Sequence, residues 1–468
     1  MTELRSGSTT GTGTVLTPGD AGYDQARTVW NADIDRRPAR IACCRSTADV
    51  VDAVRSARRD GLEIAVRGGG HSSWGASVCD DGAMVHLGGL DEIRVDPDAR
   101  RARVGGGATL GAVDRATQVH GLATTLGTNT TTGVGGLTLG GGIGWLARGH
   151  GLSIDNLVGA EVVLADGSVV HASDDEHPDL FWGLRGGGGN FGVVTEFEFA
   201  LHEVGPLVHV GVFFWPLARA EEAYRVGREV LEALPRDAGG GMIGTHAPPA
   251  PFLPEALHFT PGVLLLIAGF STLEAHLALC EPVRDAHPSA EFLTPMPYVA
   301  LQSMIDEAGA WGRLAYGKGL HLPELTDDAL SVVLEYLPRK ASPMSVFVMA
   351  GLGGAVADVG DDDTAFAGSR STRFSLAIDA VAPTPDLLIA DREWSRSFWE
   401  ALRPYAAGSY VNWNHEVDDD RIRAAYGDAK YERLRRVKAT YDPDNAFHRN
   451  VNIPPAVRGE RSWSTRSS

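Results

Sequence analysis

Glycine is concentrated in one part of the chain, and this concentration limits what that part can fold into. Of the 57 glycines among 468 residues, 31 lie between Gly61 and Gly192. Glycine turns that directly follow strands bring backbone N–H groups close to a ligand, and such turns favour anions, phosphates above all. The alternative is a set of turns in an all-β scaffold. The region is not of low complexity, because strand-like segments interrupt it at 63–66, 83–87, 101–104, 159–164, 168–171 and 193–199.

Two common nucleotide-binding motifs are not supported by this region. Gly187, Gly189 and Gly192 match the spacing G-x-G-x-x-G, but that motif must follow a strand and open a helix. Here an alternating strand-like segment, 193–199, comes after the glycines. No GxxxxGK[ST] sequence occurs. A nicotinamide dinucleotide site and ATP chemistry are therefore disfavoured.

Composition and charge narrow the choice of partners. Hydrophobic residues make up 43% of the chain and charged residues 22%, as in folded globular proteins. The net charge of −18 repels nucleic acid and anionic lipid surfaces. No apolar run approaches the ~18 residues of a membrane span, and 263–270 predicts a buried strand instead. Residues 1–16 lack the apolar segment of a secretion signal, so we expect a cytoplasmic protein with no nucleic-acid or membrane partner.

The cysteines and histidines give no sign of a metal site. Cys43, Cys44, Cys79 and Cys280 form no CxxC pair, and the fifteen histidines include no HExxH motif. Free, inert thiols are the simplest interpretation. We expect neither a disulfide framework nor a metal centre.

Several motifs taken together resemble one known family. Arg67-Gly68-Gly69-Gly70-His71-Ser72 is followed by glycine clusters at 133–136, 140–144 and 186–192. These resemble the FAD-binding domain of the vanillyl-alcohol-oxidase superfamily. Tyr410-Val411-Asn412 and the segment 441–455 resemble the closing part of its berberine-bridge-enzyme-like branch, which includes bacterial nicotine oxidases and oligosaccharide and secondary-metabolite oxidases. The resemblance extends from about residue 21 to residue 455.

The resemblance implies an α+β fold with a split FAD-binding domain of the vanillyl-alcohol-oxidase type. Residues 1–203 and the returning segment 406–455 would form that domain, 204–405 the substrate domain, and 456–468 a flexible tail. The middle region suits an antiparallel sheet covered by helices. Its pattern predicts strands at 208–214, 262–270, 345–349 and 373–380, and helices at 217–234, 273–287, 297–308, 327–336 and 387–402. A further helix is expected at 421–441.

The resemblance also implies how FAD is held. His71 follows the glycines of the first loop, where family members commonly bond a histidine to the flavin 8α-methyl carbon. The competing interpretation is a histidine that only contacts phosphate or caps the turn. The remaining cofactor-binding candidates are Arg67, Gly68, Gly69, Gly70, Ser72, Gly127, Asn129, Thr131, Thr132, Gly135, Gly136, Gly140, Gly141, Gly142, Gly192, Val194, Asn450 and Asn452.

Two positions in the segment 127–133 refine that expectation. Many members of the branch form a second flavin bond through a cysteine, and here that position is Asn129. An amide cannot form the thioether, so a single covalent link through His71 is predicted. Thr132 corresponds to a position that controls oxygen access in the family, where small or valine-like residues accompany oxidases. Its shape favours an oxidase.

The catalytic candidates come from the returning segment 406–455. Hydride transfer requires a base to take a proton from the substrate hydroxyl or amine, and Tyr410 is the first candidate, with Asn412 orienting substrate or flavin. A phenol has an unperturbed pKa of ~10, so positive charge or hydrogen bonds would have to lower the pKa of Tyr410. The alternative is a buried tyrosine with a satisfied hydroxyl. The substrate-pocket candidates are Trp413, Tyr316, Lys318 and His321.

The predicted function is that of an FAD-dependent oxidase with covalently bound flavin. An alcohol, sugar, amine or secondary metabolite would give up a hydride, and oxygen would reoxidise the flavin to yield hydrogen peroxide. The alternatives are a flavin dehydrogenase with another electron acceptor and a non-redox cyclase on the same scaffold. The expected partners are the small-molecule substrate and oxygen, and the expected assembly is a monomer or homodimer.

Overall fold

The computed structural model describes residues 13–250, 253–415 and 419–457. Two sheets lie in the N-terminal half. The first has the order β1-β2-β4-β3, in which β4 pairs in parallel with both β2 and β3. The second, β5-β6-β10-β8-β9, is antiparallel. Their bounds are β1 Thr14–Leu16, β2 Arg40–Cys43, β3 Ile64–Arg67, β4 Ala83–His86, β5 Ile93–Asp96, β6 Arg101–Gly105, β8 Leu157–Val163, β9 Val169–Ala172 and β10 Val193–Ala200.

Short helices and one small ribbon connect these sheets. β7 (Leu122–Ala123) pairs with β11 (His202–Glu203). Helix α2 begins with a capping box. The Ser46 side chain accepts a hydrogen bond from the backbone N–H of Asp49, and the Asp49 carboxylate accepts one from the backbone N–H of Ser46. This pattern is a strong signal for the start of a helix. The helices of this half are α1 Tyr23–Arg27, α2 Thr47–Arg59, α3 Leu110–Gln118, α4 Val134–Leu139, α5 Ala147–His150, α6 Pro178–Leu184 and the 3₁₀ turn η1 Ser153–Asp155.

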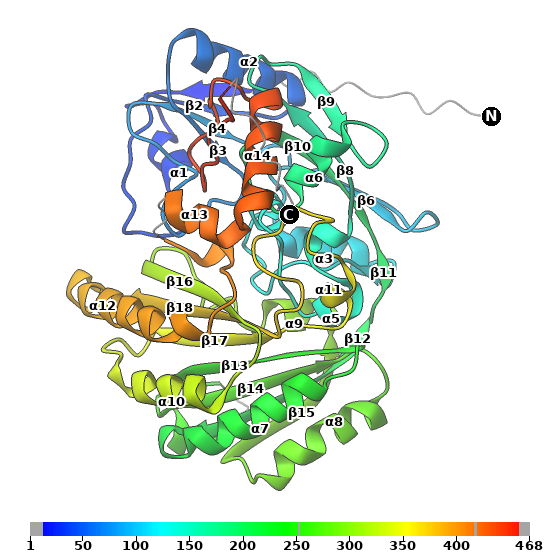
Figure 1. Ribbon diagram of the computed structural model, residues 1–468, viewed down its shortest axis with the longest axis vertical. Helices are drawn as coiled ribbons and strands as arrows, with labels where there is room; N and C mark the ends of the chain where they lie inside the picture. Colours follow the sequence, from blue (N-terminus) through cyan, green and yellow to red (C-terminus); the bar gives the residue numbers. More distant parts are fainter. Residues whose placement is uncertain (1–12, 251–252, 416–418, 458–468) are drawn as a thin grey trace, which may run out of the picture.

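A seven-stranded antiparallel sheet forms the other half of the molecule (Figure 1). Its order is β15-β12-β14-β13-β17-β18-β16, so β16 is an edge strand. The fold class expected from the sequence, α+β with an antiparallel sheet under helices, is confirmed. The bounds are β12 Leu207–Pro216, β13 Ala238–His246, β14 Pro261–Gly269, β15 Ala290–Pro297, β16 Leu314–Leu322, β17 Val346–Gly351 and β18 Phe374–Ala382.

Both faces of this sheet are covered. Val263, Leu265 and Ile267 of β14 belong to one core cluster, which also includes residues of the covering helices. The alternate residues Leu264 and Leu266 belong to a second cluster, because successive side chains of a strand point to opposite faces. A strand buried on both faces reads as one continuous apolar run. The helices on the first face are α7 Ala220–Ala233, α8 Leu273–Asp285, α10 Asp327–Tyr336 and α12 Pro385–Leu402.

The opposite face of the sheet meets the N-terminal half. Its cluster joins Val210 and Phe214 of β12 to Leu146 and to Tyr298 and Leu301 of α9. Helix α9 (Tyr298–Ser303) is shorter than the helix expected at 297–308, and the described chain continues in turns. The remaining short elements are α11 Ala355–Asp358, η2 Leu217–Arg219, η3 Glu255–Leu257, η4 Leu337–Arg339, η5 Arg403–Tyr405 and η6 Val411–Trp413.

The C-terminal segment packs against the N-terminal half. Leu434 and Val437 of α14 (Asp428–Tyr441) share one core with Phe181 and Phe191, and α14 lies beside α6 in Figure 1. The single helix expected at 421–441 is two helices, α13 (Asp419–Tyr426) and α14. They are separated by Gly427, which adopts φ +74° and so interrupts the helical backbone. The expected flexible tail at 456–468 lies outside the described residues except for its first two.

A fully buried ion pair holds the end of this segment. The Lys438 and Asp442 side chains have no exposed area and lie 2.6 Å apart. Lys438 Nζ also donates to the carbonyls of Asn190 and Phe447, at 2.6 and 3.0 Å. Asp442 accepts the backbone N–H groups of Ala446 and Phe447. Every charge is thus paired, and the pair orders the chain that leads to Asn450 and Asn452.

We predict that Lys438→Met destabilises the protein by about 3–5 kcal/mol, because the Asp442 carboxylate loses its counter-charge in a buried site. Urea unfolding monitored by tryptophan fluorescence measures this loss. The control is Arg236→Met, which breaks the exposed ion pair with Asp358 and should cost less than about 1 kcal/mol. Equal losses in the two variants would contradict the prediction.

No helix among the described residues is long and apolar enough to cross a membrane. No group of three or more His, Cys, Asp or Glu side chains within the same ranges is placed to hold a metal ion. The four cysteines are free thiols, three of them buried.

Candidate active site

The loop after β3 packs its backbone directly against a second loop. A Cβ atom on Gly69 would overlap the backbone of Gly133, and a Cβ atom on Gly133 would overlap that of Gly69. Gly70 adopts φ +71°, which a side chain would disfavour. Among the described residues, no protein acceptor faces the backbone N–H groups of 69–72. Unpaired amides in a concave loop suit an anionic group such as a pyrophosphate.

His71 lies at the end of this loop between two tryptophans. Its ring stacks on Trp30, with centroids 5.6 Å apart, and meets the edge of Trp311 at the same distance. Burial lowers the pKa of His71 to about 4, although the Asp306 carboxylate opposes the shift. The imidazole is therefore neutral at pH 7 and keeps a lone pair. A neutral imidazole is the form that can act as a nucleophile.

The second loop supplies two threonines to His71. Thr131 Oγ1 lies 2.8 Å from His71 Nε2, and Thr132 Oγ1 lies 3.5 Å from Nδ1. The preceding residue Thr130 is held by Asp306, which accepts its backbone N–H at 2.8 Å and its hydroxyl. A pocket of about 500 Å³ opens here, lined by Gly68, Gly69, Gly107, Thr109, Thr130, Thr131 and Trp311, among others.

Other predicted cofactor residues surround the same loops. Arg67 is buried under the first loop, where Nη1 donates to the Ala26 carbonyl and lies 2.9 Å from His86 Nε2. Ser72 Oγ accepts the Ala76 N–H and so stabilises the turn. Gly135 packs near Phe197, whereas Gly136 faces open space. The close-packed glycines, where a side chain would collide with protein atoms, are Gly127, Gly140, Gly141, Gly142 and Gly192; Val194 precedes a bulge in β10.

The last two predicted cofactor residues, Asn450 and Asn452, lie in the returning segment 406–455. Asn450 Nδ2 donates to the carbonyls of Gly189 and Phe447, both at 3.0 Å. The Oδ1 atoms of Asn450 and Asn452 are buried and have no hydrogen-bond partner within the part of the chain that the structure describes. An acceptor left unpaired in a buried place is costly unless a ligand or water pairs with it. The unpaired backbone N–H groups of residues 69–72 are donors, and these two oxygens are acceptors. Together they suit a bound dinucleotide, which has both phosphate oxygens and polar ring atoms.

Tyr410 is buried beside His321 of β16, and its hydroxyl oxygen accepts two hydrogen bonds. Tyr410 Oη accepts the backbone N–H of Gly142 at 2.8 Å and Asn412 Nδ2 at 3.0 Å. Asn412 Nδ2 also donates to the Leu137 carbonyl. The two N–H groups favour the phenolate, but burial outweighs them and raises the pKa of Tyr410 above its ordinary value. The hydrogen bonds expected to lower this pKa are present, yet in the protein alone Tyr410 stays protonated at pH 7.

Aromatic and polar side chains enclose Tyr410. Trp413 meets its ring edge-on at 5.1 Å, and Phe366 lies 6.3 Å away. The His321 ring lies 6.1 Å from Tyr410, fully buried, with neither ring nitrogen paired to a described residue. Burial lowers the pKa of His321 to about 4. His321 therefore offers one donor and one acceptor to a ligand beside Tyr410.

The strand pairing adds two residues that the sequence analysis missed. Ser375 of β18 pairs directly with His321, and Asp379 pairs with Gly317, so these side chains share one face of the sheet. Trp413 packs over Gly317 and Gly319 of the same face. Burial raises the pKa of Asp379 to about 7. The available signal was one serine and one aspartate within the otherwise apolar segment Phe374–Ala382.

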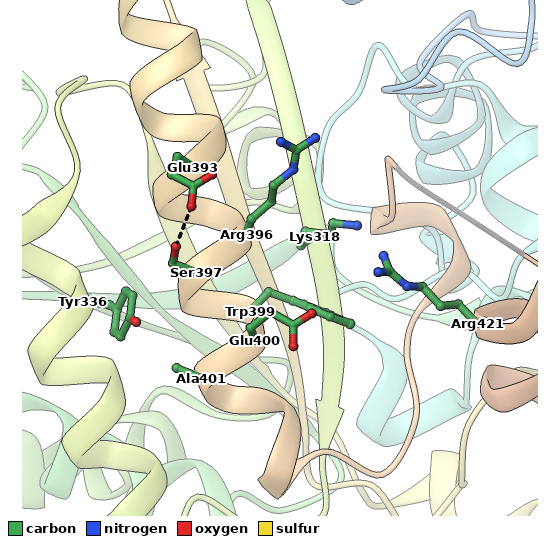
Figure 2. Close-up of a pocket in the computed structure, with 9 residues that line it drawn as sticks. All are labelled: Lys318, Tyr336, Glu393, Arg396, Ser397, Trp399, Glu400, Ala401 and Arg421. Atoms are coloured by element: carbon green, nitrogen blue, oxygen red, sulfur yellow. Dashed lines mark hydrogen bonds between the residues drawn. The ribbon is translucent and has the colours of Figure 1, made fainter.

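The structure does not bring Tyr316 and Lys318 to Tyr410. Both point to the other face of β16, towards α12, where Arg396 Nε donates to Tyr316 Oη at 3.2 Å. Lys318 Nζ lies 5.4 Å from the Trp399 ring. Figure 2 shows Lys318, Trp399, Arg396 and Arg421 around a pocket of about 720 Å³ on this outer face. The reason is the two-residue period of a strand, which separates 316 and 318 from 317, 319 and 321.

Two family models and a near-full-length relative match this chain. The family model for the FAD binding domain matches residues 38–173, and the model "Berberine and berberine like" matches residues 409–454. (R)-6-hydroxynicotine oxidase of Paenarthrobacter nicotinovorans is 30% identical over 460 residues, which cover 95% of this chain and 97% of the relative.

Two solved structures have the same fold. The structure of 6-hydroxy-D-nicotine oxidase from Arthrobacter nicotinovorans superposes with a TM-score of 0.83 at 27% identity and covers 95% of this chain and 98% of that chain. Glucooligosaccharide oxidase from Acremonium strictum, which carries 6-S-cysteinyl, 8α-N1-histidyl FAD, gives a TM-score of 0.83 at 25% identity with the same coverage. The chain matches both family models and is 30% identical to a nicotine oxidase over nearly the full length of both proteins. It therefore belongs to the berberine-bridge-enzyme-like branch of the vanillyl-alcohol-oxidase superfamily and is an FAD-linked oxidoreductase.

Proposed function

We propose that this protein is an oxidase that takes a hydride from an alcohol, sugar, amine or secondary metabolite and passes the electrons to oxygen, forming hydrogen peroxide. The observation that carries the proposal is Tyr410, whose hydroxyl oxygen accepts two N–H groups and whose ring lies beside the buried ring of His321. Residues 1–203 and 406–455 would bind FAD, and 204–405 would bind the substrate. Bound FAD supplies the hydride acceptor.

In this proposal Tyr410 acts as the base. As the substrate loses its hydride, its hydroxyl or amine proton must leave, and the phenolate form of Tyr410, whose fraction grows as pH rises, takes that proton. The N–H groups of Gly142 and Asn412 stabilise the negative charge on Tyr410 Oη. His321 hydrogen-bonds a polar group of the substrate, and Trp413 packs over Gly317 and Gly319 on the same face of the sheet.

We further propose one covalent link to flavin, through His71. The environment of His71 keeps its imidazole neutral, as a nucleophile requires. The related glucooligosaccharide oxidase carries both histidyl and cysteinyl bonds, and the family resemblance places Asn129 at the cysteine position. An amide nitrogen cannot replace a thiolate there. Thr132, beside His71, is small enough to leave oxygen a path to the flavin.

The test is oxygen consumption by the purified holoenzyme with a panel of sugars, alcohols, amines and aromatic secondary metabolites. An oxidase consumes oxygen and releases hydrogen peroxide in equal amounts with one of these classes. Turnover with an artificial electron acceptor under nitrogen, together with no oxygen use in air, would identify a dehydrogenase. Conversion without net electron transfer would identify a cyclase.

A further inference from the structure

Two hydrogen bonds determine which way the Asn129 side-chain amide points. Asn129 Oδ1 accepts the backbone N–H of Thr131 at 3.1 Å and the Thr131 hydroxyl at 2.7 Å. A backbone N–H can only donate, so the amide atom that faces it must be the oxygen. The oxygen can only accept, so the Thr131 hydroxyl proton points to Asn129.

The orientation of the Thr131 hydroxyl then decides the protonation of His71. Because its proton is directed to Asn129, Thr131 Oγ1 offers a lone pair to His71 Nε2, 2.8 Å away. Nε2 must therefore carry the imidazole proton. In a neutral imidazole the other nitrogen is then unprotonated. The lone pair of His71 lies on Nδ1, next to Thr132.

Contacts from the substrate half keep this loop in place. Asp306 binds the backbone N–H and the hydroxyl of Thr130, and Gly309 packs against the Asn129 amide nitrogen so closely that a Cβ atom would overlap it. Trp30 Nε1 donates to the Gly309 carbonyl at 2.7 Å, and Trp30 stacks on His71. The Asn129–Thr131 pair and the imidazole are thus held by the same segment.

We propose that Asn129 and Thr131 are positioning residues that hold His71 in the tautomer with its proton on Nε2, so that Nδ1 is the atom that bonds flavin. This rests on the proposed covalent link. In the step, the Nδ1 lone pair forms the bond to the flavin 8α carbon, a C–H bond of that methyl group breaks, and the Nε2 proton is also released. The electron pair of the C–H bond passes to the flavin and then to molecular oxygen, which takes up two protons as hydrogen peroxide.

The test compares matched variants of the full-length protein produced in riboflavin-starved cells. Thr131→Val and Asn129→Ala each remove the hydrogen-bond chain, whereas Thr131→Ser and Asn129→Asp retain it. ¹⁵N NMR of the His71 imidazole, assigned with His71→Ala, reports the tautomer before any flavin is added. After addition of FAD in air, the rate at which acid-stable flavin appears reports the bond.

We expect wild type, Thr131→Ser and Asn129→Asp to show the proton on Nε2. Thr131→Val and Asn129→Ala should show a mixture of tautomers and form acid-stable flavin about 3- to 10-fold more slowly, as loss of one hydrogen bond implies. Unchanged tautomer and rate in either of these variants, provided that it folds, overturn the relay alone. No acid-stable flavin in wild type overturns the covalent link, and the proposal with it.

Discussion

Replacing Tyr410 with phenylalanine is expected to slow the reduction of bound flavin by substrate by about 10²- to 10⁴-fold, the contribution of a positioned base. The substitution removes one oxygen from a buried ring and leaves its packing on Trp413 and Phe366 in place. It also leaves the Gly142 N–H without its acceptor. Anaerobic stopped-flow absorbance at the flavin band measures the rate, and the flavin content should not change.

The pH profile separates a base from a residue that only packs. Burial raises the pKa of Tyr410, so the phenolate fraction grows as pH rises towards and beyond ~10. The wild-type rate should therefore increase with pH across the neutral and alkaline range, and the Phe variant should lose this dependence. Tyr316→Phe is the matched control, because that tyrosine is buried on the opposite face of β16. A drop in Tyr316→Phe as large as in Tyr410→Phe would contradict the assignment.

His71→Ala is expected to abolish acid-stable flavin completely. In wild type the yellow colour should remain with the protein after acid precipitation, whereas in the variant all flavin should appear in the supernatant. Absorbance of pellet and supernatant, and the intact mass of the protein, measure this. The glycine loops, Asn450 and Asn452 are unchanged in the variant, so FAD should still bind reversibly.

The pKa of His71 adds a pH dependence to this result. Since burial holds that pKa at about 4, the imidazole stays mostly neutral at pH 5.5, where an ordinary histidine with a pKa of ~6.5 is mostly protonated. Covalent attachment should therefore proceed at pH 5.5 nearly as fast as at pH 7.5. The exposed His120 provides the control, because His120→Ala should retain the covalent flavin. Equal acid-stable flavin in His71→Ala and His120→Ala would contradict the link.

Local signals in the sequence were sufficient for much of the secondary structure. The helix expected at 327–336 has those bounds, because Thr326 caps it by accepting the Ala329 N–H at 3.1 Å. The apolar run at 263–270 is a strand buried on both faces. A cap or a run of one polarity acts over a few residues, so tertiary context changes it little. The α+β fold and the family, suggested by the order of motifs, are confirmed.

Predictions that depended on three-dimensional placement were less successful. The segment Leu314–Leu322 mixes glycine with polar residues and was not recognised as a strand, yet its pairing with β18 decides the site. That pairing puts His321 with Ser375 and Asp379 on one face and turns Tyr316 and Lys318 to the other. A side chain's face depends on the partner strand and its register, which no local pattern in this segment reveals.

Residue types and their order are enough to infer that glycine loops leave backbone N–H groups free for an anionic cofactor, that His71 ends one of these loops, and that the family is one of FAD-linked oxidoreductases. The folded molecule is needed to see which distant groups meet: Gly142 with Tyr410, Thr131 with His71, and Asp306 with Thr130. Loop glycines act through the conformational freedom of their own backbone, and this freedom depends on the residue type alone. Hydrogen bonds between segments far apart in the chain depend on how sheets and helices pack, and that packing is a property of the whole molecule.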